Sequence, residues 1–232
     1  MDIDDKNFRR FNDKADAVLY YSQKIERDFD FLNQQIQTDF HEIDIKRYET
    51  RQCVALGLGI SAIVMISVTL EECLKTFLKY HHFILKIDKS VEGGLEEWGK
   101  ASLEAEDAFG TYMLHNAIQK ARKEELITLE EESILIEVKE FIRNAFVHSD
   151  KSKIFDASQK IPVASIGIKD DGSRLNENRE MNILELNFAQ GFAEKKLADE
   201  NCLKIFQDVD HIIVTICQRF WATHHRSGEE NK

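Results

Sequence analysis

The chain has 232 residues and carries 42 acidic against 31 basic side chains, which gives a formal net charge of −11. This length suits one large domain, and ten glycines with a single proline are too few for the turns of an all-β fold. The acidic balance opposes loose, delocalised binding to nucleic acid or to an acidic membrane surface, so any nucleic-acid contact must be a local site.

The N-terminus and the cysteines indicate a reducing compartment. The first residues, MDIDDKN, are acidic where a signal peptide is basic and then apolar, and no two cysteines form a C-x-x-C pair. Each cysteine lies in an apolar helical segment, where a small buried side chain is the simplest role. We therefore expect a cytoplasmic protein with no cofactor and no metal, whose free thiols are Cys53, Cys73, Cys202 and Cys217.

The first 50 residues predict a long N-terminal helix, because no glycine or proline precedes Gly57 and apolar side chains recur at steps of three and four. This stripe consists of Phe8, Phe11, Ala15, Val18, Ser22, Ile25, Phe29, Leu32 and Ile36. An unbroken helix from Lys6 to Arg47 would be roughly 60 Å long, which exceeds a small domain. The helix therefore either kinks near Thr38–His41 or packs on a second subunit, and the sequence leaves both open.

From Gln52 to Leu70 the chain carries no charge over nineteen residues, which as a helix would cover roughly 28 Å, close to the thickness of a bilayer core. A membrane span and a central helix buried on all sides both fit this length. The apolar stripe continues through the charged sequence beyond Leu70, as far as Leu78, which favours the buried helix and no membrane.

Residues 86–110 are rich in glycine and acidic side chains and predict an acidic connector with room for a short helix. A further helix is expected from Thr111 to Glu125. The next helix begins after Thr128, where Glu131 stands three residues on and completes a capping-box pattern. Its expected core stripe is Ile134, Val138, Phe141 and Ala145.

Between residues 150 and 190 the spacing of apolar residues changes from a helical to an alternating pattern. This change predicts a β-hairpin insertion with a long polar loop. Its expected strands lie around Val163–Ile168 and Leu184–Phe188, on either side of an Asp-Asp-Gly turn. The last helix is expected from about Ala193, with an apolar stripe of Cys202, Phe206, Val209, Ile213, Ile216 and Phe220. The sequence thus predicts a single, mainly α domain over residues 1–232, with a bundle of about five helices and the hairpin before the last one.

The pattern with the clearest chemical content is the run RNAFVH, from Arg143 to His148, at the end of the predicted fourth helix. An Arg-x4-His spacing alone means little, and Arg219 with His224 is a second match. Requiring Asn, Asp or His after the arginine lowers the chance expectation to about 0.06 matches in a chain of this composition. Arg143-Asn144 meets that requirement, whereas Phe220 follows Arg219.

This run resembles the Arg-x4-6-His signature of the HEPN families, which are small helical bundles, typically dimeric. Many members are metal-independent endoribonucleases that act as toxins or in anti-phage defence, and others are inactive relatives that bind RNA or nucleotides. The resemblance implies a HEPN-like bundle with RNA as the substrate, a homodimer, and an antitoxin protein as a candidate partner. In those families an earlier helix carries an acidic residue, and Glu71 has that place here.

Metal-free RNA cleavage needs a base for the 2′-hydroxyl proton, an acid for the leaving 5′-oxygen, and positive charge beside the phosphate. His148 suits the proton transfers, Arg143 suits the phosphate, and Asn144 could orient the imidazole or bind a phosphate oxygen. Glu71 lies on the buried stripe of its helix, where a carboxylate requires a partner, and Arg143 is the attractive candidate.

Five residues turn an α-helix by about 140°, so Arg143 and His148 do not converge on one point of a continuous helix. Either the helix ends near His148, or a two-fold dimer brings two copies of the motif together. A purely structural interpretation stays open as well, with His148 in the core and Arg143 in an ion pair with Glu71. The functional alternative to the nuclease is a non-catalytic dimeric module that binds RNA, a nucleotide or a protein partner in the same pocket.

Overall fold

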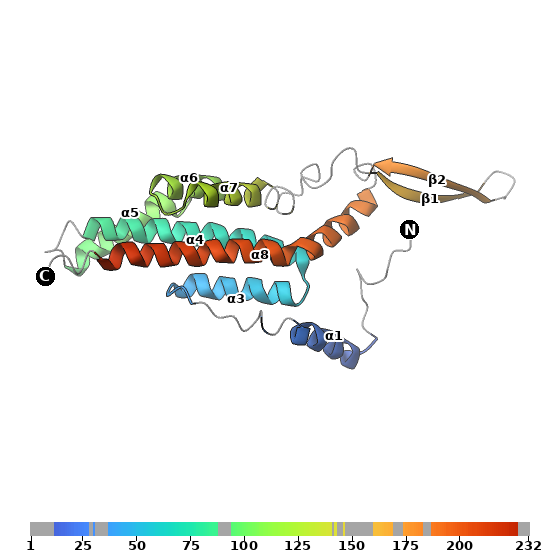
Figure 1. The fold of residues 1–232 in the computed structure, drawn as a ribbon, viewed down its shortest axis with the longest axis horizontal. Coiled ribbons are helices and arrows are strands. Elements are labelled where there is room, and N and C mark those ends of the chain that lie inside the picture. The colour runs from blue at the N-terminus through green and yellow to red at the C-terminus, as the bar shows by residue number, and fades with distance from the viewer. Residues whose placement is uncertain are drawn as a thin grey trace.

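A computed structural model describes residues 12–27, 30, 37–87, 94–140, 142, 146, 160–168, 174–182 and 187–226 (Figure 1). The chain is mainly helical, with a pair of antiparallel strands. The helices and strands are α1 Lys14–Arg27, α3 His41–Ala55, α4 Gly59–Ile87, α5 Leu95–Phe109, α6 Leu114–Lys123, α7 Leu129–Val138, β1 Lys160–Ile168, β2 Arg174–Asn182 and α8 Asn187–Arg226.

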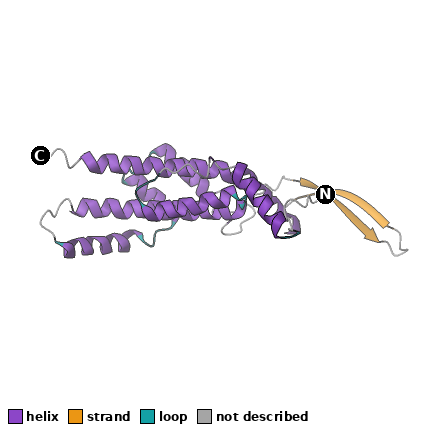
Figure 2. Ribbon diagram, turned by 90° about the horizontal axis from the view of Figure 1, so that it is seen from below, coloured by secondary structure: helices purple, strands orange, loops and turns teal. Residues whose placement is uncertain are grey.

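The two longest helices, α4 and α8, run side by side through the centre of a helical bundle (Figures 1 and 2). On one side α3 packs against both of them. On the other side α5 and α6 pack on α4, and α7 packs on α6 and α8. Because α4 contacts α3, α5, α6 and α8, it is covered on nearly all sides, as its apolar sequence predicts.

Burial of α4 and α8 follows the predicted stripes. On α4 the side chains of Ile63 and Leu74 have no exposed surface, and Leu78 is 1% exposed. On α8 each residue of the predicted stripe from Cys202 to Phe220 is at most 3% exposed. Cys73, Cys202 and Cys217 are buried and Cys53 is half-buried, all as free thiols, and burial raises the pKa of each. The expectation of a small buried side chain is confirmed at Cys73, Cys202 and Cys217 and met in part at Cys53.

A turn divides the uncharged stretch between Gln52 and Leu70. Helix α3 ends at Ala55, and Gly57 takes a φ of 67°, a left-handed conformation that favours glycine. The next helix starts at Gly59, where a Cβ atom would lie 2.6 Å from the backbone nitrogen of Asp199 on α8. Within the described ranges, no helix combines the length and the hydropathy that crossing a bilayer requires.

The predicted long N-terminal helix over residues 1–50 is not continuous. Helices α1 and α3 are separate, and the break falls at the predicted kink, where Asp39 has a φ of 64°. The carboxylate of Asp44 accepts hydrogen bonds from the backbone N–H of Thr38 at 3.0 Å and from its hydroxyl at 3.0 Å. These bonds give the chain before α3 a polar partner that a continuous helix would not need.

The apolar stripe predicted for the N-terminal helix is exposed on α1. The side chains of Val18 and Ile25, which belong to this stripe, are 59% and 41% exposed. Helix α1 lies beyond α3, away from α4 and α8, and Lys24 Nζ donates a hydrogen bond to the Leu56 carbonyl at 3.0 Å (Figure 1). Periodicity predicted this helix correctly over Lys14–Arg27, but not the burial of its apolar face.

The acidic connector over residues 86–110 contains a full helix, α5, rather than a short one. Its small side chains Ala101 and Ala105, with Phe109, are buried on α4, while the acidic side chains face outward. The glycines that predicted a loop lie near the ends of this helix and at Gly99, where no neighbour would contact an added Cβ.

Strands β1 and β2 pair antiparallel, with Lys160 opposite Asn182 and Ile168 opposite Arg174 (Figure 1). The second strand is therefore the polar segment RLNENREMN and not Leu184–Phe188, and Phe188 belongs to α8. The connection between the paired strands comprises residues 169–173, which lie outside the described residues, and it is shorter than the expected long loop. Side-chain alternation misled the prediction, since β2 has few apolar residues to mark it.

Five aromatic rings join α3, α4 and α8 at one end of the bundle. Phe40, which is 4% exposed, lies edge to face with Phe77 at 5.1 Å, Tyr80 at 5.0 Å and Phe220 at 5.7 Å, and it stacks on Trp221 at 5.3 Å between ring centroids. Such pairs add about 0.5–1.5 kcal/mol each beyond the apolar area that they bury. Phe40 therefore fixes the start of α3 on the two central helices.

We expect Phe40→Ala to lower the free energy of unfolding by about 3–5 kcal/mol, because it removes the central ring of this cluster and leaves a cavity. Urea denaturation followed by circular dichroism measures the change. Tyr48→Ala on the same helix is the control, since Tyr48 is 53% exposed and its loss should cost about 0.5 kcal/mol at most. Equal effects of the two substitutions would contradict the assignment.

Candidate functional site

The predicted site residues Arg143, Asn144 and His148 lie outside the described residues, so their side chains have no geometry to report. The described residues around them are informative. Helix α7 ends at Val138, and Lys139, Glu140, Ile142 and Phe146 belong to π-helical backbone. Ile142 is 1% and Phe146 6% exposed, so both are buried in the bundle core.

Glu71 is described, and its carboxylate joins two helices. The side chain is 18% exposed, Oε1 lies 3.1 Å from Lys75 Nζ on α4, and Oε2 accepts a hydrogen bond from the backbone N–H of Leu114 at 3.0 Å. Glu72 points elsewhere and is 42% exposed, 3.6 Å from Lys75 and 3.8 Å from Lys46. Of the two neighbouring carboxylates, Glu71 is thus the more buried one.

The bond to Leu114 gives Glu71 a structural role that the sequence did not indicate. Leu114 is the first residue of α6, and the preceding residue, Met113, makes no side-chain cap. The first N–H groups of a helix lack partners within the helix and carry partial positive charge, which a carboxylate satisfies. Glu71 therefore caps α6 from α4.

Arg219, in the second Arg-x4-His match, has a structural role. Its guanidinium donates to both carboxylate oxygens of Glu131, at 2.8 and 3.1 Å, and to the Leu126 carbonyl at 2.6 Å. Glu131 also completes the predicted capping box with Thr128, which is confirmed. Burial raises the pKa of Glu131, but the hydrogen bonds from Arg219 and Thr128 outweigh it and lower that pKa.

A groove of about 370 Å³ lies between α7 and α8, and one of its lining residues, Ile142, directly precedes Arg143 in the chain. We name it the α7–α8 groove; it is lined by Ile134, Glu137, Val138, Ile142, Asn201, Lys204, Ile205 and Asp208. The four aliphatic side chains are buried or half-buried, whereas Glu137, Lys204 and Asp208 are exposed. Sequence analysis missed the polar residues on α8, because solvent-facing positions of a helix carry no periodic signal of their own.

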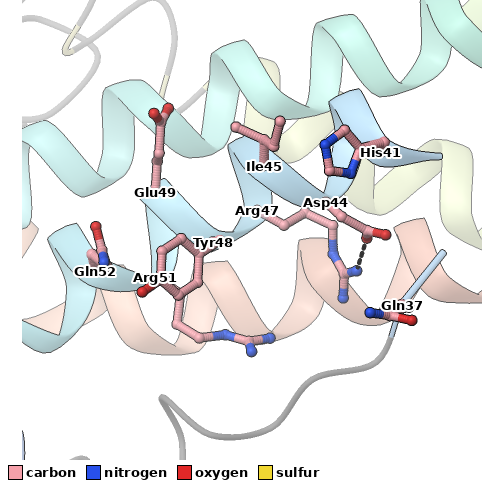
Figure 3. A pocket seen from close by; sticks show the side chains of 9 residues that line it. All are labelled: Gln37, His41, Asp44, Ile45, Arg47, Tyr48, Glu49, Arg51 and Gln52. Atoms are coloured by element: carbon pink, nitrogen blue, oxygen red, sulfur yellow. Dashed lines mark hydrogen bonds and ion pairs between the residues drawn. The ribbon is translucent and has the colours of Figure 1, made fainter. Parts of the chain in front are cut away.

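A second groove, of about 420 Å³, runs along the outer face of α3 (Figure 3). Arg47 and Arg51 from this helix extend towards α8, and both are almost fully buried. Arg47 donates through Nε to Asp210 at 2.6 Å, through Nη2 to the other oxygen of Asp210 at 3.0 Å, and through Nη1 to Asp44 at 2.8 Å. Sequence analysis did not identify this cluster.

The pKa values of the two arginines are shifted in opposite directions. Burial lowers the pKa of Arg47, but the hydrogen bonds and charges of Asp210 and Asp44 outweigh it, so that pKa is raised. Arg51 lies 3.6 Å from Asp210 and 5.8 Å from the ring centre of Phe206, and burial lowers its pKa. Two carboxylates balance two guanidinium groups here, so the cluster joins α3 to α8 without offering net positive charge to a phosphate.

His81 on α4 faces α6, where its Nε2 lies 3.7 Å from Glu124. Burial lowers the pKa of His81, with Glu124 opposing that shift and His82 and Lys120 adding to it. Burial also lowers the pKa of His82, whose ring lies edge to face with Phe109. Adjacent histidines on one helix thus contact different neighbours.

Among the described residues, no three His, Cys, Asp or Glu side chains come together as the ligands of a metal ion would. Comparison of the chain with protein-family models, with curated proteins and with solved structures finds no match in any of the three.

We expect Asp210→Ala to lower the free energy of unfolding by about 3–5 kcal/mol, because it removes a carboxylate that both buried guanidinium groups approach. Chemical denaturation measures the loss. Asp208→Ala removes an exposed carboxylate from the same helix and should change stability by about 0.5 kcal/mol at most. A small effect of Asp210→Ala would show that the two arginines do not depend on it.

Stability should fall as the pH drops below about 6.5, the ordinary pKa of histidine. In the folded protein the pKa values of His81 and His82 are lowered, so the unfolded chain binds protons first as the pH falls, and unfolding is favoured. His81→Gln should weaken this dependence between pH 6.5 and 5, measured by urea denaturation at each pH. His115→Gln, at an exposed position of α6, should leave it unchanged.

Proposed function

We propose that this chain is a metal-independent endoribonuclease of HEPN type, which acts in the cytoplasm as a toxin or anti-phage defence effector. The RNAFVH run follows α7 and precedes the long helix α8, the order in which HEPN families place their motif. The mainly helical bundle around α4 and α8 is compatible with this class.

The observation that carries the proposal is the π-helical backbone beside the motif. In a π-helix, hydrogen bonds join residues five apart, so residues at that spacing lie nearly above one another. Arg143 and His148 are five apart, and on an α-helix they would diverge by about 140°. Ile142, directly before the motif, and Phe146, within it, have π-helical backbone, a conformation frequent at functional sites.

In the proposed reaction, His148 takes the proton from the 2′-hydroxyl of RNA, and the resulting oxygen attacks the neighbouring phosphorus. Arg143 binds the phosphate oxygens through its planar guanidinium and stabilises the charge that develops on them. Asn144 orients the imidazole. A second proton must reach the leaving 5′-oxygen, and we propose that His148 of a second copy in a homodimer supplies it.

Glu71 is a positioning residue in this proposal. Its bond to the first N–H of α6 connects α4 to the α6–α7 pair that leads into the motif, and its ion pair with Lys75 lies within α4. A carboxylate held in this way keeps the start of α6 at a fixed distance from α4. Movement of α6 would carry α7, and with it the motif.

The alternative is a non-catalytic dimeric module that binds RNA, a nucleotide or a protein partner. The net charge of −11 favours it to some degree, since broad RNA affinity relies on basic surfaces that release counterions. For the nuclease, by contrast, the acidic charge would suit a basic antitoxin as the partner protein. This module would use the motif for binding and would cleave nothing.

We expect the purified protein to cleave a mixed RNA pool in the presence of EDTA and to leave 2′,3′-cyclic phosphate ends. His148→Ala should reduce the rate by about 10²–10⁴-fold, because it removes the general acid and base. Gel electrophoresis with end-group analysis measures both results, and circular dichroism checks the fold.

His211→Ala is the matched control, since His211 is an exposed histidine on α8 outside the motif, and cleavage should persist in this variant. Equal rates for His148→Ala and the unsubstituted protein would assign the cleavage to a contaminant. No cleavage by either protein, with both folded, would favour the binding module.

A further inference from the structure

The α7–α8 groove has the size and lining of a site for a flat heterocycle. Its cavity of about 370 Å³ falls in the range of small-molecule pockets. Aliphatic side chains form its floor, with Val138 and Ile142 from the motif side and Ile205 from α8. Such a floor removes apolar ring faces from water, while polar groups at the rim can bind ring edges.

The charged groups at the rim are not used by the fold. Among the residues that the structure describes, Glu137, Lys204 and Asp208 take part in no hydrogen bond or ion pair. Lys204 and Asp208 are four apart on α8 and line one side of the groove, yet they do not pair with each other. On a helix this order, with lysine first, is the less favourable one for an ion pair.

The charges of the groove select a base and exclude a phosphate. Two carboxylates, Glu137 and Asp208, stand against the single ammonium of Lys204, so a phosphate inside the groove would be repelled. An ionised carboxylate only accepts hydrogen bonds, and its two oxygens suit a pair of adjacent N–H donors. Lys204, beside Asp208 in the groove, supplies N–H donors for an acceptor atom of the bound base.

Guanine matches this order of groups. Its Watson–Crick edge presents the O6 acceptor beside the N1–H and N2–H donors, and lysine binds the O6 and N7 atoms of guanine in many complexes. Lys204 can therefore donate to O6 while Asp208 accepts from N1–H and N2–H. Uracil presents two carbonyl oxygens, one on each side of a single N–H, and the carboxylates would repel these oxygens. Adenine presents a ring nitrogen without a proton where guanine has N1–H.

We propose that the α7–α8 groove binds a guanine base of the RNA substrate, next to the bond that is cut. This proposal rests on the proposed function for the RNA, because Ile142 at the end of the groove directly precedes Arg143. The base in the groove would fix which phosphate reaches the motif. The groove thus gives the nuclease a preference for cleavage beside guanosine.

Binding of RNA that cannot be cleaved tests the groove separately from catalysis. We would measure, by fluorescence anisotropy, the affinity for 2′-O-methyl oligouridine that carries one central guanosine, inosine, adenosine or uridine. The methyl group blocks the 2′-oxygen, so His148 has no reaction to perform. The guanosine oligonucleotide should bind at least about tenfold more tightly than that with inosine, which lacks the N2 donor.

Asp208→Asn should abolish this preference for guanosine, and Glu200→Gln should keep it, since Glu200 is an exposed carboxylate on α8 outside the groove. Circular dichroism checks that both variants fold. Equal affinity for the four oligonucleotides would overturn the proposal, as would a preference that survives Asp208→Asn. Undetectable binding of all four would overturn it as well.

Guanosine monophosphate alone is a further probe, which separates the two sources of the base. If guanosine monophosphate binds more weakly than the guanosine oligonucleotide, the result supports RNA as the ligand. If the two bind with equal affinity, and Asp208→Asn abolishes binding of both, the groove is a guanine site for a free nucleotide and the assignment to RNA is overturned. Failure of the nuclease would be distinct from both. In that case guanosine binding persists without cleavage, and the groove belongs to the binding module.

Discussion

The arrangement of the bundle depends on one constraint, which is that the long helix α4 carries apolar side chains over most of its length that must be buried. A helix of this kind cannot face water, so other helices must surround it. Helices α5, α6 and α8 present apolar side chains to it, and α3 presents a mixed face on which Ile43 and Val54 are buried beside Arg47 and Arg51. The polar links then follow from this packing, because Glu71 on α4 reaches the start of α6, and Arg47 on α3 reaches Asp210 on α8.

The charged pairs in the interior have a different role from the apolar packing. Burying an ion pair costs desolvation energy that its attraction only partly returns, so the Arg47–Asp210 pair adds little net stability over a well-packed apolar pair. Its value lies in orientation, because a guanidinium that binds both oxygens of one carboxylate fixes how α3 lies on α8. Arg219 with Glu131 does the same between α8 and α7.

Local patterns predicted the features that local physics determines. The capping box at Thr128 and the apolar stripe of α8 involve neighbours within a few residues, and both are confirmed. The exposed face of α1, the α3–α8 arginine cluster and the Glu71 cap depend on partners far along the chain, which periodicity does not reveal. At the candidate site, the sequence identified the RNAFVH run, whereas the polar side of the α7–α8 groove became visible only when two helices were placed together.

Helix α7 is held by polar contacts at its start and by buried apolar side chains at its end. At its start, Glu131 forms the capping box with Thr128, and two hydrogen bonds from Arg219 connect Glu131 to α8. At its end, the regular helix gives way to π-helical backbone beside the α7–α8 groove. A rotation of α7 about Glu131 would displace the opposite end of the helix most, and would widen or narrow the groove. Because Ile142 and Phe146 beyond this end are buried in the core, the same rotation would also disturb the packing there.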